Sequence, residues 1–144
     1  MTGDGDSGKP YALDDQIGFV LRQAHQRHTA IFAARMIGDL TPTQFAALAR
    51  LHAEGPVSQN QLGRLTAMDV ATIKGVVDRL IARGLVATSP DAADARRRVV
   101  ALTDIGHELI LRALPVAAAI TAETLEPLAA DEQASLLAQL ARLR

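Results

Sequence analysis

The sequence contains no cysteine, and this absence excludes several kinds of site at once. Without thiols there is no disulfide, no thiolate metal ligand, no cysteine nucleophile and no thiol-based redox sensor. Tryptophan is also absent, and phenylalanine, tyrosine and tryptophan together make up 3% of the chain. A core so poor in aromatic residues must be built from leucine, alanine, valine and isoleucine, a mixture that favours packed helices over an aromatic-rich β-sandwich.

Long apolar runs and catalytic motifs are missing as well. No run approaches the ~18–20 residues that a membrane-spanning helix needs, and the polar stretch 1–9 does not resemble a signal peptide. We therefore expect a cytoplasmic protein with no membrane partner. There is no glycine-rich phosphate loop, no nucleophile beside a base and no metal-spaced cluster, so we expect no enzyme, no cofactor and no metal site.

The charge is small overall but unevenly placed. The formal net charge of the 144 residues is −1. Between Arg64 and Arg98, however, seven basic residues stand against four acidic ones, while the rest of the chain has eight basic and twelve acidic residues. The sequence therefore predicts one locally electropositive segment, which is compatible with binding nucleic acid.

The length fits one domain, and helical signals dominate it. After a tail that we expect to be flexible, residues 1–10, apolar spacing predicts a helix over 14–37, stopped by Gly38. Thr41-Pro42-Thr43-Gln44 has the pattern of a capping box, with proline in the first helical position, and begins a second helix that Gly55-Pro56 ends.

Two further caps predict two closely spaced helices. Ser58 begins a short helix ending at Leu65, and Asp69 begins another ending near Arg83 and Gly84. The next residues change to strand-like runs, 85–88 and 98–102, joined by a charged turn over 89–97, which predicts a hairpin.

Helical spacing then returns. Thr103 is expected to cap a long helix over 104–126, in which Pro115 predicts a kink or a break because it lacks an N–H group. A last amphipathic helix over 128–144 presents Leu136, Leu137, Leu140 and Leu143 on one side.

Helix, short helix, helix and hairpin, in this order, are typical of a winged helix-turn-helix. The fold class is therefore mainly α with a small β-hairpin wing, and residues 41–103 form the winged unit. The helix over 69–83 is expected to enter the major groove, with the preceding short helix braced against the DNA backbone. The residues that this arrangement turns toward DNA are Ser58, Gln59, Asn60, Asp69, Ala71, Thr72, Lys74 and Gly75.

The hairpin supplies a second group of expected DNA contacts. Arg96, Arg97 and Arg98 lie at or just after its tip, where a guanidinium can enter a narrow minor groove. Asp94 is positioned to form an ion pair with Arg96 and to orient it.

From about Leu13 to Leu143 the chain resembles the MarR family of transcription regulators. The resemblance rests on the segment 40–45, Leu-Thr-Pro-Thr-Gln-Phe, and on Asp94-Ala95-Arg96 followed by Leu102-Thr103 and Gly106. It implies that Arg96 is the wing arginine and that the helices at 11–38 and 104–144 form a homodimer. It also implies that the protein binds double-stranded operator DNA through two copies of the winged unit, one from each protomer.

Two further segments, 18–25 and 63–69, resemble a subgroup of regulators that respond to aromatic carboxylates such as nicotinate, protocatechuate and hydroxybenzoate. By this resemblance Arg22 binds the carboxylate of the effector, and His25 or His28 contacts a ring substituent. A guanidinium is suited to this role because it can form two parallel hydrogen bonds with a carboxylate. From the residues alone, a solvated or dimer-facing polar stripe on the helix is the favoured interpretation of Arg22, His25 and His28, and the resemblance makes it an even alternative. His52 and His107 are expected to be isolated.

The expected function is therefore that of a ligand-responsive DNA-binding regulator, a repressor of an aromatic-acid catabolic or efflux operon. Occupation of the effector site is expected to release the protein from a pseudo-palindromic operator. Two alternatives remain open: a helical adaptor that keeps the fold without binding DNA, and a regulator that senses a different small molecule.

Overall fold

The structure is a computed structural model and describes residues 8–144. The predicted tail falls largely on residues 1–7, which lie outside this range. Within this described range, six α-helices, one short 3-10 helix and three strands follow in the order η2 (Leu13–Asp15), α1 (Ile17–Arg35), α2 (Pro42–Glu54), β1 (Val57–Ser58), α3 (Gln59–Leu65), α4 (Val70–Ala82), β2 (Val86–Pro90), β3 (Arg98–Leu102), α5 (Asp104–Leu125) and α6 (Ala130–Ala141).

The predicted fold class is confirmed: the chain is mainly helical and carries one small antiparallel sheet. The strand order is β1-β3-β2, so β3 lies between the other strand of the wing and the two residues that precede α3. Val57 pairs with Val100 and Ser58 with Val99, which ties the start of α3 to the base of the wing. The sequence did not predict β1, because two residues are too few to show an alternating pattern.

The four expected helix caps are all present. The Thr41 hydroxyl accepts the Gln44 N–H at 3.2 Å, and the Gln44 side chain accepts the Thr41 N–H, which completes the capping box. Ser58, Asp69 and Thr103 accept the N–H groups three residues further on, at 3.1, 2.7 and 3.1 Å. Local side-chain chemistry therefore sets the start of α2, α3, α4 and α5.

One core joins the winged unit to the first half of α5. Its centre consists of fully enclosed aliphatic side chains from α2, α3, α4, β3 and α5: Leu48, Leu62, Ile73, Val77, Leu80, Val100 and Ile110. Burial of large aliphatic side chains is the main stabilising term in a domain of this size. The winged unit therefore rests on α5 and takes part of that helix into its own core.

The first helix is shorter than expected. α1 begins at Ile17 and ends at Arg35, whereas the apolar spacing predicted 14–37. Gln16 and Met36 both have extended backbone, and these two residues separate η2 and the following turn from the helix. Gly38 does not stop α1 but lies in the next turn with φ +66°, where a Cβ atom would be 2.8 Å from the side chain of Leu109.

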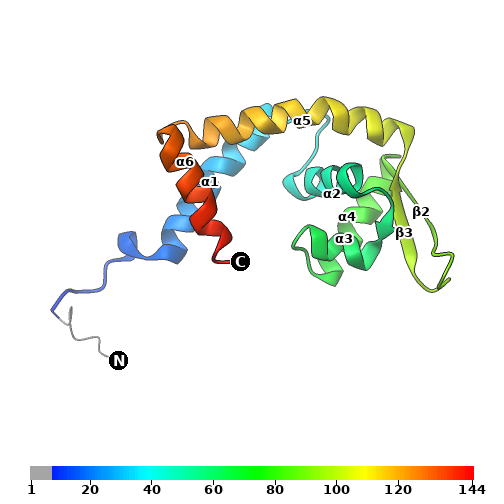
Figure 1. Cartoon of the computed structure of the whole chain (residues 1–144), viewed down its shortest axis with the longest axis horizontal. Coiled ribbons are helices and arrows are strands. Elements are labelled where there is room, and N and C mark those ends of the chain that lie inside the picture. Colours follow the sequence, from blue (N-terminus) through cyan, green and yellow to red (C-terminus); the bar gives the residue numbers. More distant parts are fainter. Residues whose placement is uncertain (1–7) are drawn as a thin grey trace.

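Helix α5 runs through Pro115 without a break and crosses the top of the molecule in Figure 1, from the wing to α6. By length and composition it is apolar enough to cross a membrane, contrary to the expectation that no segment reaches this size. The reason is its run of alanine, leucine and isoleucine, which tolerates a few interspersed charges. In the structure this composition lets α5 pack on both α1 and α2.

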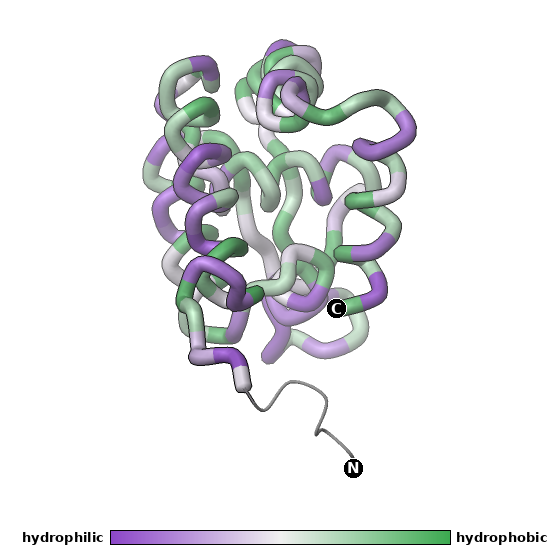
Figure 2. The backbone as a smooth tube through the Cα atoms, turned by 90° about the vertical axis from the view of Figure 1, so that its left-hand side faces the viewer, coloured by the Kyte–Doolittle hydropathy of each residue, from purple (hydrophilic) through white to green (hydrophobic). Residues whose placement is uncertain are grey.

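The terminal helices α1 and α6 lie on the other side of the molecule from the winged unit (Figure 1). In α1 only Ile31 and Phe32 are buried, in a small cluster with Ile120 of α5, and α6 has no buried residue. Figure 2 shows hydrophobic and hydrophilic stretches alternating along these two helices. The Glu132 carboxylate accepts the Ala129 N–H at 2.8 Å, so α6 has a partial cap although alanine occupies the cap position.

Candidate nucleic-acid interface

Helix α4 presents one face to the core and the other to solvent. Ile73, Val76, Val77 and Leu80 are buried, whereas Ala71, Thr72 and Lys74 are exposed and Gly75 is half-buried. A side chain at Gly75 would begin 3.2 Å from the Arg79 guanidinium, so Arg79 extends back along the outer face of α4. Small residues on the exposed face of a helix let it approach DNA closely.

Asp69 holds the first turn of α4 in place. Its carboxylate accepts the Thr72 N–H at 2.7 Å, and this hydrogen bond holds the pKa of Asp69 below its ordinary value. The neighbouring Val70 is 70% exposed, an unusual position for a large apolar side chain. Valine at the tip of a groove-entering helix can contact the methyl group of thymine. The sequence prediction did not include Val70, and it favoured an ordinary helix-surface charge for Arg79. The only signals for these two residues are their positions, next to the cap and one turn after Gly75.

The turn of the wing is held by its own side chains. Asp94 accepts two hydrogen bonds from the Arg96 guanidinium, at 3.1 and 3.3 Å, and lies 3.9 Å from the Arg97 guanidinium. The predicted Asp94–Arg96 ion pair is therefore present in the structure, and its hydrogen bonds hold the pKa of Asp94 below the ordinary value. The Arg96 side chain is 91% exposed, so Asp94 orients it without removing it from solvent.

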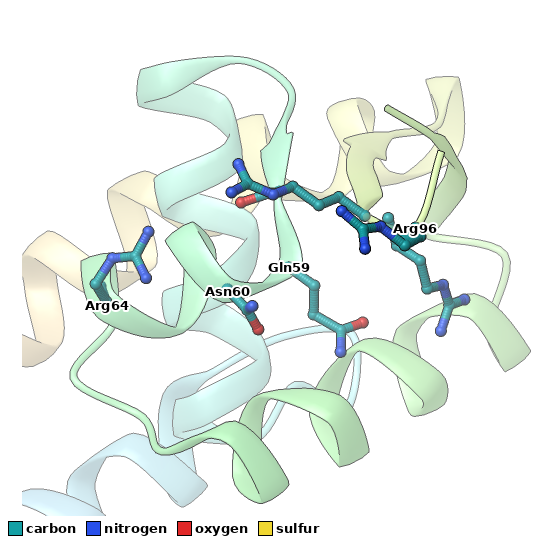
Figure 3. Close-up of a pocket in the computed structure, with 7 residues that line it drawn as sticks. Gln59, Asn60, Arg64 and Arg96 are labelled. Atoms are coloured by element: carbon teal, nitrogen blue, oxygen red, sulfur yellow. The ribbon is translucent and has the colours of Figure 1, made fainter. Parts of the chain in front are cut away.

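A cavity of about 240 Å³ lies between the start of α3 and the wing. Figure 3 shows Arg64 and Arg96 at its two ends, with Gln59 and Asn60 between them. Its lining contains no acidic residue and consists of Ser58, Gln59, Asn60, Arg64, Arg96, Arg97 and Arg98. Six of these residues were predicted as DNA contacts, and the structure brings them together on one surface.

Arg64 is the lining residue that the sequence did not single out. It lies on α3, exposed, and two of its guanidinium nitrogens donate to the Gln61 side chain at 2.7 and 3.2 Å. The Gln59 Oε1 atom is buried and has no hydrogen-bond partner among the described residues. Four guanidiniums around amide and hydroxyl groups can neutralise and hydrogen-bond phosphate oxygens, so the cavity is suited to a nucleic-acid backbone.

The three residues predicted to bind an effector are not gathered in one place. Arg22 and His25 are exposed on α1. His28 is half-buried, and its Nδ1 atom lies 3.0 Å from the Thr124 hydroxyl of α5. The structure of the single chain thus brings His28 onto α5 and leaves the other two residues on the surface.

The remaining histidines correct a second expectation. His52 of α2 and His107 of α5, predicted to be isolated, have ring centroids 5.6 Å apart because the two helices pack together. Within residues 8–144, no three histidine or acidic side chains come together in a way that could hold a metal ion.

Comparison with known proteins gives both a family and close structural relatives. Residues 38–97 match the model of the MarR family. The HTH-type transcriptional repressor NicR of Pseudomonas putida is 42% identical over 135 residues, which cover 93% of this chain and 85% of the repressor.

Two solved structures have nearly the same fold. A probable transcriptional regulator from Pseudomonas aeruginosa is 54% identical, with a TM-score of 0.90 over 92% of this chain and 100% of that chain. BpsR of Bordetella bronchiseptica, whose DNA binding is regulated by 6-hydroxynicotinic acid, is 38% identical, with a TM-score of 0.90 over 94% of this chain and 97% of its own.

Proposed function

Since the chain belongs to the MarR family of transcription regulators, we propose that it is a homodimeric repressor whose binding to operator DNA is released by a small aromatic carboxylate. One observation carries the DNA part: the arginine-lined cavity between α3 and the wing has no acidic lining residue and lies beside the exposed face of α4. In this arrangement α4 enters the major groove, and Arg96 of the wing enters the adjacent minor groove.

The exposed apolar side chains of the terminal helices support the homodimer. Ile17 of α1 lines one apolar surface hollow with Leu136, Leu140 and Leu143 at the end of α6. Leu143 is 71% exposed, and Ile17 and Leu137 are more than half exposed. Contiguous apolar surface of this kind marks an interface, and a second copy of the same helices would bury it. A two-fold dimer then binds two half-sites related by a pseudo-palindrome.

The effector part of the proposal rests on Arg22 and on the relatives. Helix α1 has three arginines, and two of them are engaged at the end of α5. Arg27 donates to the carbonyl oxygens of Glu123 and Thr124, and Arg35 forms an ion pair with the Glu123 carboxylate. Among residues 8–144, no hydrogen-bond or ion-pair partner reaches Arg22, so its guanidinium is available to a ligand carboxylate.

The site is completed, in this proposal, by the second copy of the chain. Arg22 is exposed in the single chain, and a pocket that encloses a small acid needs protein surfaces on more than one side of the ligand. Binding there releases DNA only if the acid prefers the arrangement in which the two α4 helices are spaced wrongly for the operator. His25 and His28 remain the proposed contacts to a ring substituent.

The experiment measures operator binding by fluorescence anisotropy, with the upstream region of the protein's own gene as DNA. Nicotinate, 6-hydroxynicotinate, protocatechuate and 4-hydroxybenzoate are titrated into the complex. We expect at least one acid to release the wild-type protein, and Arg22→Ala to bind DNA normally but to need more than about tenfold more acid, given couplings of about 1–3 kcal/mol.

Arg35→Ala is the matched control, because it removes the same charge from the same helix and breaks an exposed ion pair. Such pairs contribute little to stability, so this variant should respond to the acid like the wild type. Release of Arg22→Ala at wild-type concentrations excludes Arg22 from the effector site. Failure of every aromatic acid to release the wild type contradicts the effector class and leaves a regulator of a different small molecule.

Arg96→Ala tests the DNA contact separately. The variant should lose about 1–3 kcal/mol of operator binding, the size of one good specific contact, while its melting temperature stays unchanged. Wild-type binding should also weaken steeply as salt rises, because each neutralised phosphate releases counterions. An affinity that does not depend on salt contradicts DNA binding through this surface.

A further inference from the structure

One carboxylate lies between a cation of α4 and a cation of the wing. Asp78 is on α4, one turn after Lys74, and its Oδ2 atom accepts a hydrogen bond from the Lys74 ammonium at 2.9 Å. Its other oxygen, Oδ1, lies 4.0 Å from the guanidinium of Arg98, the first residue of β3. Asp78 thus bridges two of the residues proposed to contact DNA, one from each DNA-facing element.

The wing side of this bridge is itself held in position. Arg98 donates to the Thr88 hydroxyl at 2.9 Å, and Thr88 is on β2, the neighbouring strand of the hairpin. The Arg98 side chain therefore crosses the hairpin before it reaches Asp78. Through this chain of contacts, the outer face of α4 is connected to both strands of the wing.

Folding alone gives little reason for this arrangement. The side chains of Lys74, Asp78 and Arg98 are 62%, 46% and 45% exposed, and ion pairs that are so exposed contribute almost nothing to stability. The hydrogen bond from Lys74 lowers the pKa of Asp78, so the carboxylate is charged at neutral pH. A negative charge on a surface that faces phosphates also opposes DNA binding, because it repels the DNA backbone.

We propose that Asp78 is a positioning residue for DNA recognition: it holds Lys74 and Arg98 as one cluster, so that α4 and the wing present their cations in a single geometry. This inference rests on the proposed function as a DNA-binding regulator. In the operator complex the cluster meets phosphates or base edges at the correct spacing. On other DNA, Asp78 keeps the two cations from adapting to whichever phosphates are near, and so lowers non-specific affinity.

The consequence is a prediction about the ratio of two affinities. In Asp78→Asn both cations are released and one negative charge is removed. Binding to DNA of unrelated sequence should become about tenfold tighter at low salt, and the slope of log affinity against log salt should steepen by about 1, as expected for one additional phosphate contact. Operator affinity should change much less, so the operator preference should fall by about tenfold.

The experiment measures both affinities by anisotropy at four salt concentrations, for the wild type, Asp78→Asn and Asp78→Glu. Asp78→Glu keeps the charge and should retain most of the operator preference. Asp91→Asn is the control, because Asp91 is another wing carboxylate, and its side chain accepts the N–H of Ala93 within the wing turn itself. It changes the charge equally and should tighten binding to both DNAs together, with the preference unchanged.

The outcomes separate this inference from the proposed function. If the wild type binds operator with steep salt dependence but Asp78→Asn keeps its operator preference, the proposed function stands and the positioning role is wrong. An equal loss of preference in Asp91→Asn also overturns it, because charge alone would then explain the effect. If the wild type shows no preference for the operator at all, both the function and this inference fail.

Discussion

The winged unit and the terminal helices α1 and α6 differ in how they bury their apolar residues. In the winged unit, leucine, isoleucine and valine from every element meet in one core with the first half of α5. In the terminal helices, two residues of α1 are buried and none of α6. One region is thus completed by its own chain, while the other presents an apolar surface for a second copy to cover.

Because of this difference, substitutions in the winged unit and substitutions in the terminal helices should have different effects on stability. Stability and folding of the winged unit depend on contacts within one chain, so single substitutions there should alter unfolding directly. Substitutions on the outer faces of α1 and α6 should instead alter how the stability depends on protein concentration.

Leu48→Ala should have the largest effect. Leu48 is fully buried on α2, and a deletion of this size in a core costs about 2–5 kcal/mol of unfolding free energy. Leu137→Ala, on the exposed face of α6, should hardly change unfolding but should weaken self-association. Chemical denaturation and light scattering measure the two effects, and equal losses of unfolding free energy in both variants would contradict the comparison.

Gly106→Ala should come next. Gly106 lies in the first turn of α5, and a Cβ atom there would be 2.0 Å from the Leu85 carbonyl oxygen, a contact with rigid backbone. The resulting shift should cost about 1–3 kcal/mol or more. At Gly18 of α1 nothing lies within 4 Å of a Cβ atom, so Gly18→Ala should stabilise by up to about 1 kcal/mol through helix propensity. Thermal unfolding of both variants measures the changes in stability, which should be of opposite sign.

Thr103→Ala should have a moderate effect. The Thr103 hydroxyl accepts the Gly106 N–H at 3.1 Å and donates to the Gly84 carbonyl at 2.6 Å, which connects the end of α4 to the start of α5. Loss of such a cap costs about 1 kcal/mol. Thr29→Ala, within α1, removes a hydroxyl that bonds only its own helix and should be neutral within about 0.5 kcal/mol. A neutral Thr103→Ala would show that this connection is dispensable.

The smallest effect concerns pH. Because the pKa of Asp69 is lowered in the folded state by its hydrogen bond to the Thr72 N–H, its contribution is present above the ordinary pKa of 3.8. It is lost as the pH falls below 3.8 through the lowered value. Asp69→Asn keeps a capping oxygen without a titrating group, so its stability should vary less over this range. Denaturation curves of both proteins between pH 5 and pH 2 make the comparison, and parallel curves would contradict the assignment.

Much of the winged unit could be predicted from the sequence, because its elements begin with short polar signals. Thr41, Ser58, Asp69 and Thr103 all cap the helices expected of them. The limits of α1 were wrong because apolar spacing continues through Ile37, whereas the backbone already turns at Met36. Spacing reports which side chains are apolar and does not report where the backbone leaves the helix.

The candidate site was predictable to a different extent. Wing arginines and outward residues of α4 follow from motif and periodicity. The three wing arginines line one cavity together with Ser58, Gln59 and Asn60, which were also predicted, and with Arg64, which was not. The meeting of Lys74, Asp78 and Arg98 could not be read from the sequence, since it depends on how the wing folds back toward α4. The roles of Arg22, His25 and His28 stay predictions, because they depend on the surroundings that a second copy provides.

Pro115 removes one backbone hydrogen bond from the middle of α5. The helix is about 33 Å long, and backbone hydrogen bonds along its axis make it stiff. Proline supplies no N–H to the carbonyl of Leu111, so one of these hydrogen bonds is missing near the middle of α5. On the N-terminal side of Pro115, α5 packs into the core of the winged unit. On the C-terminal side it carries Thr124, the hydrogen-bond partner of His28. A displacement of α1 that is passed on through Thr124 would therefore have to cross the segment of α5 that lacks this hydrogen bond before it reaches the winged unit.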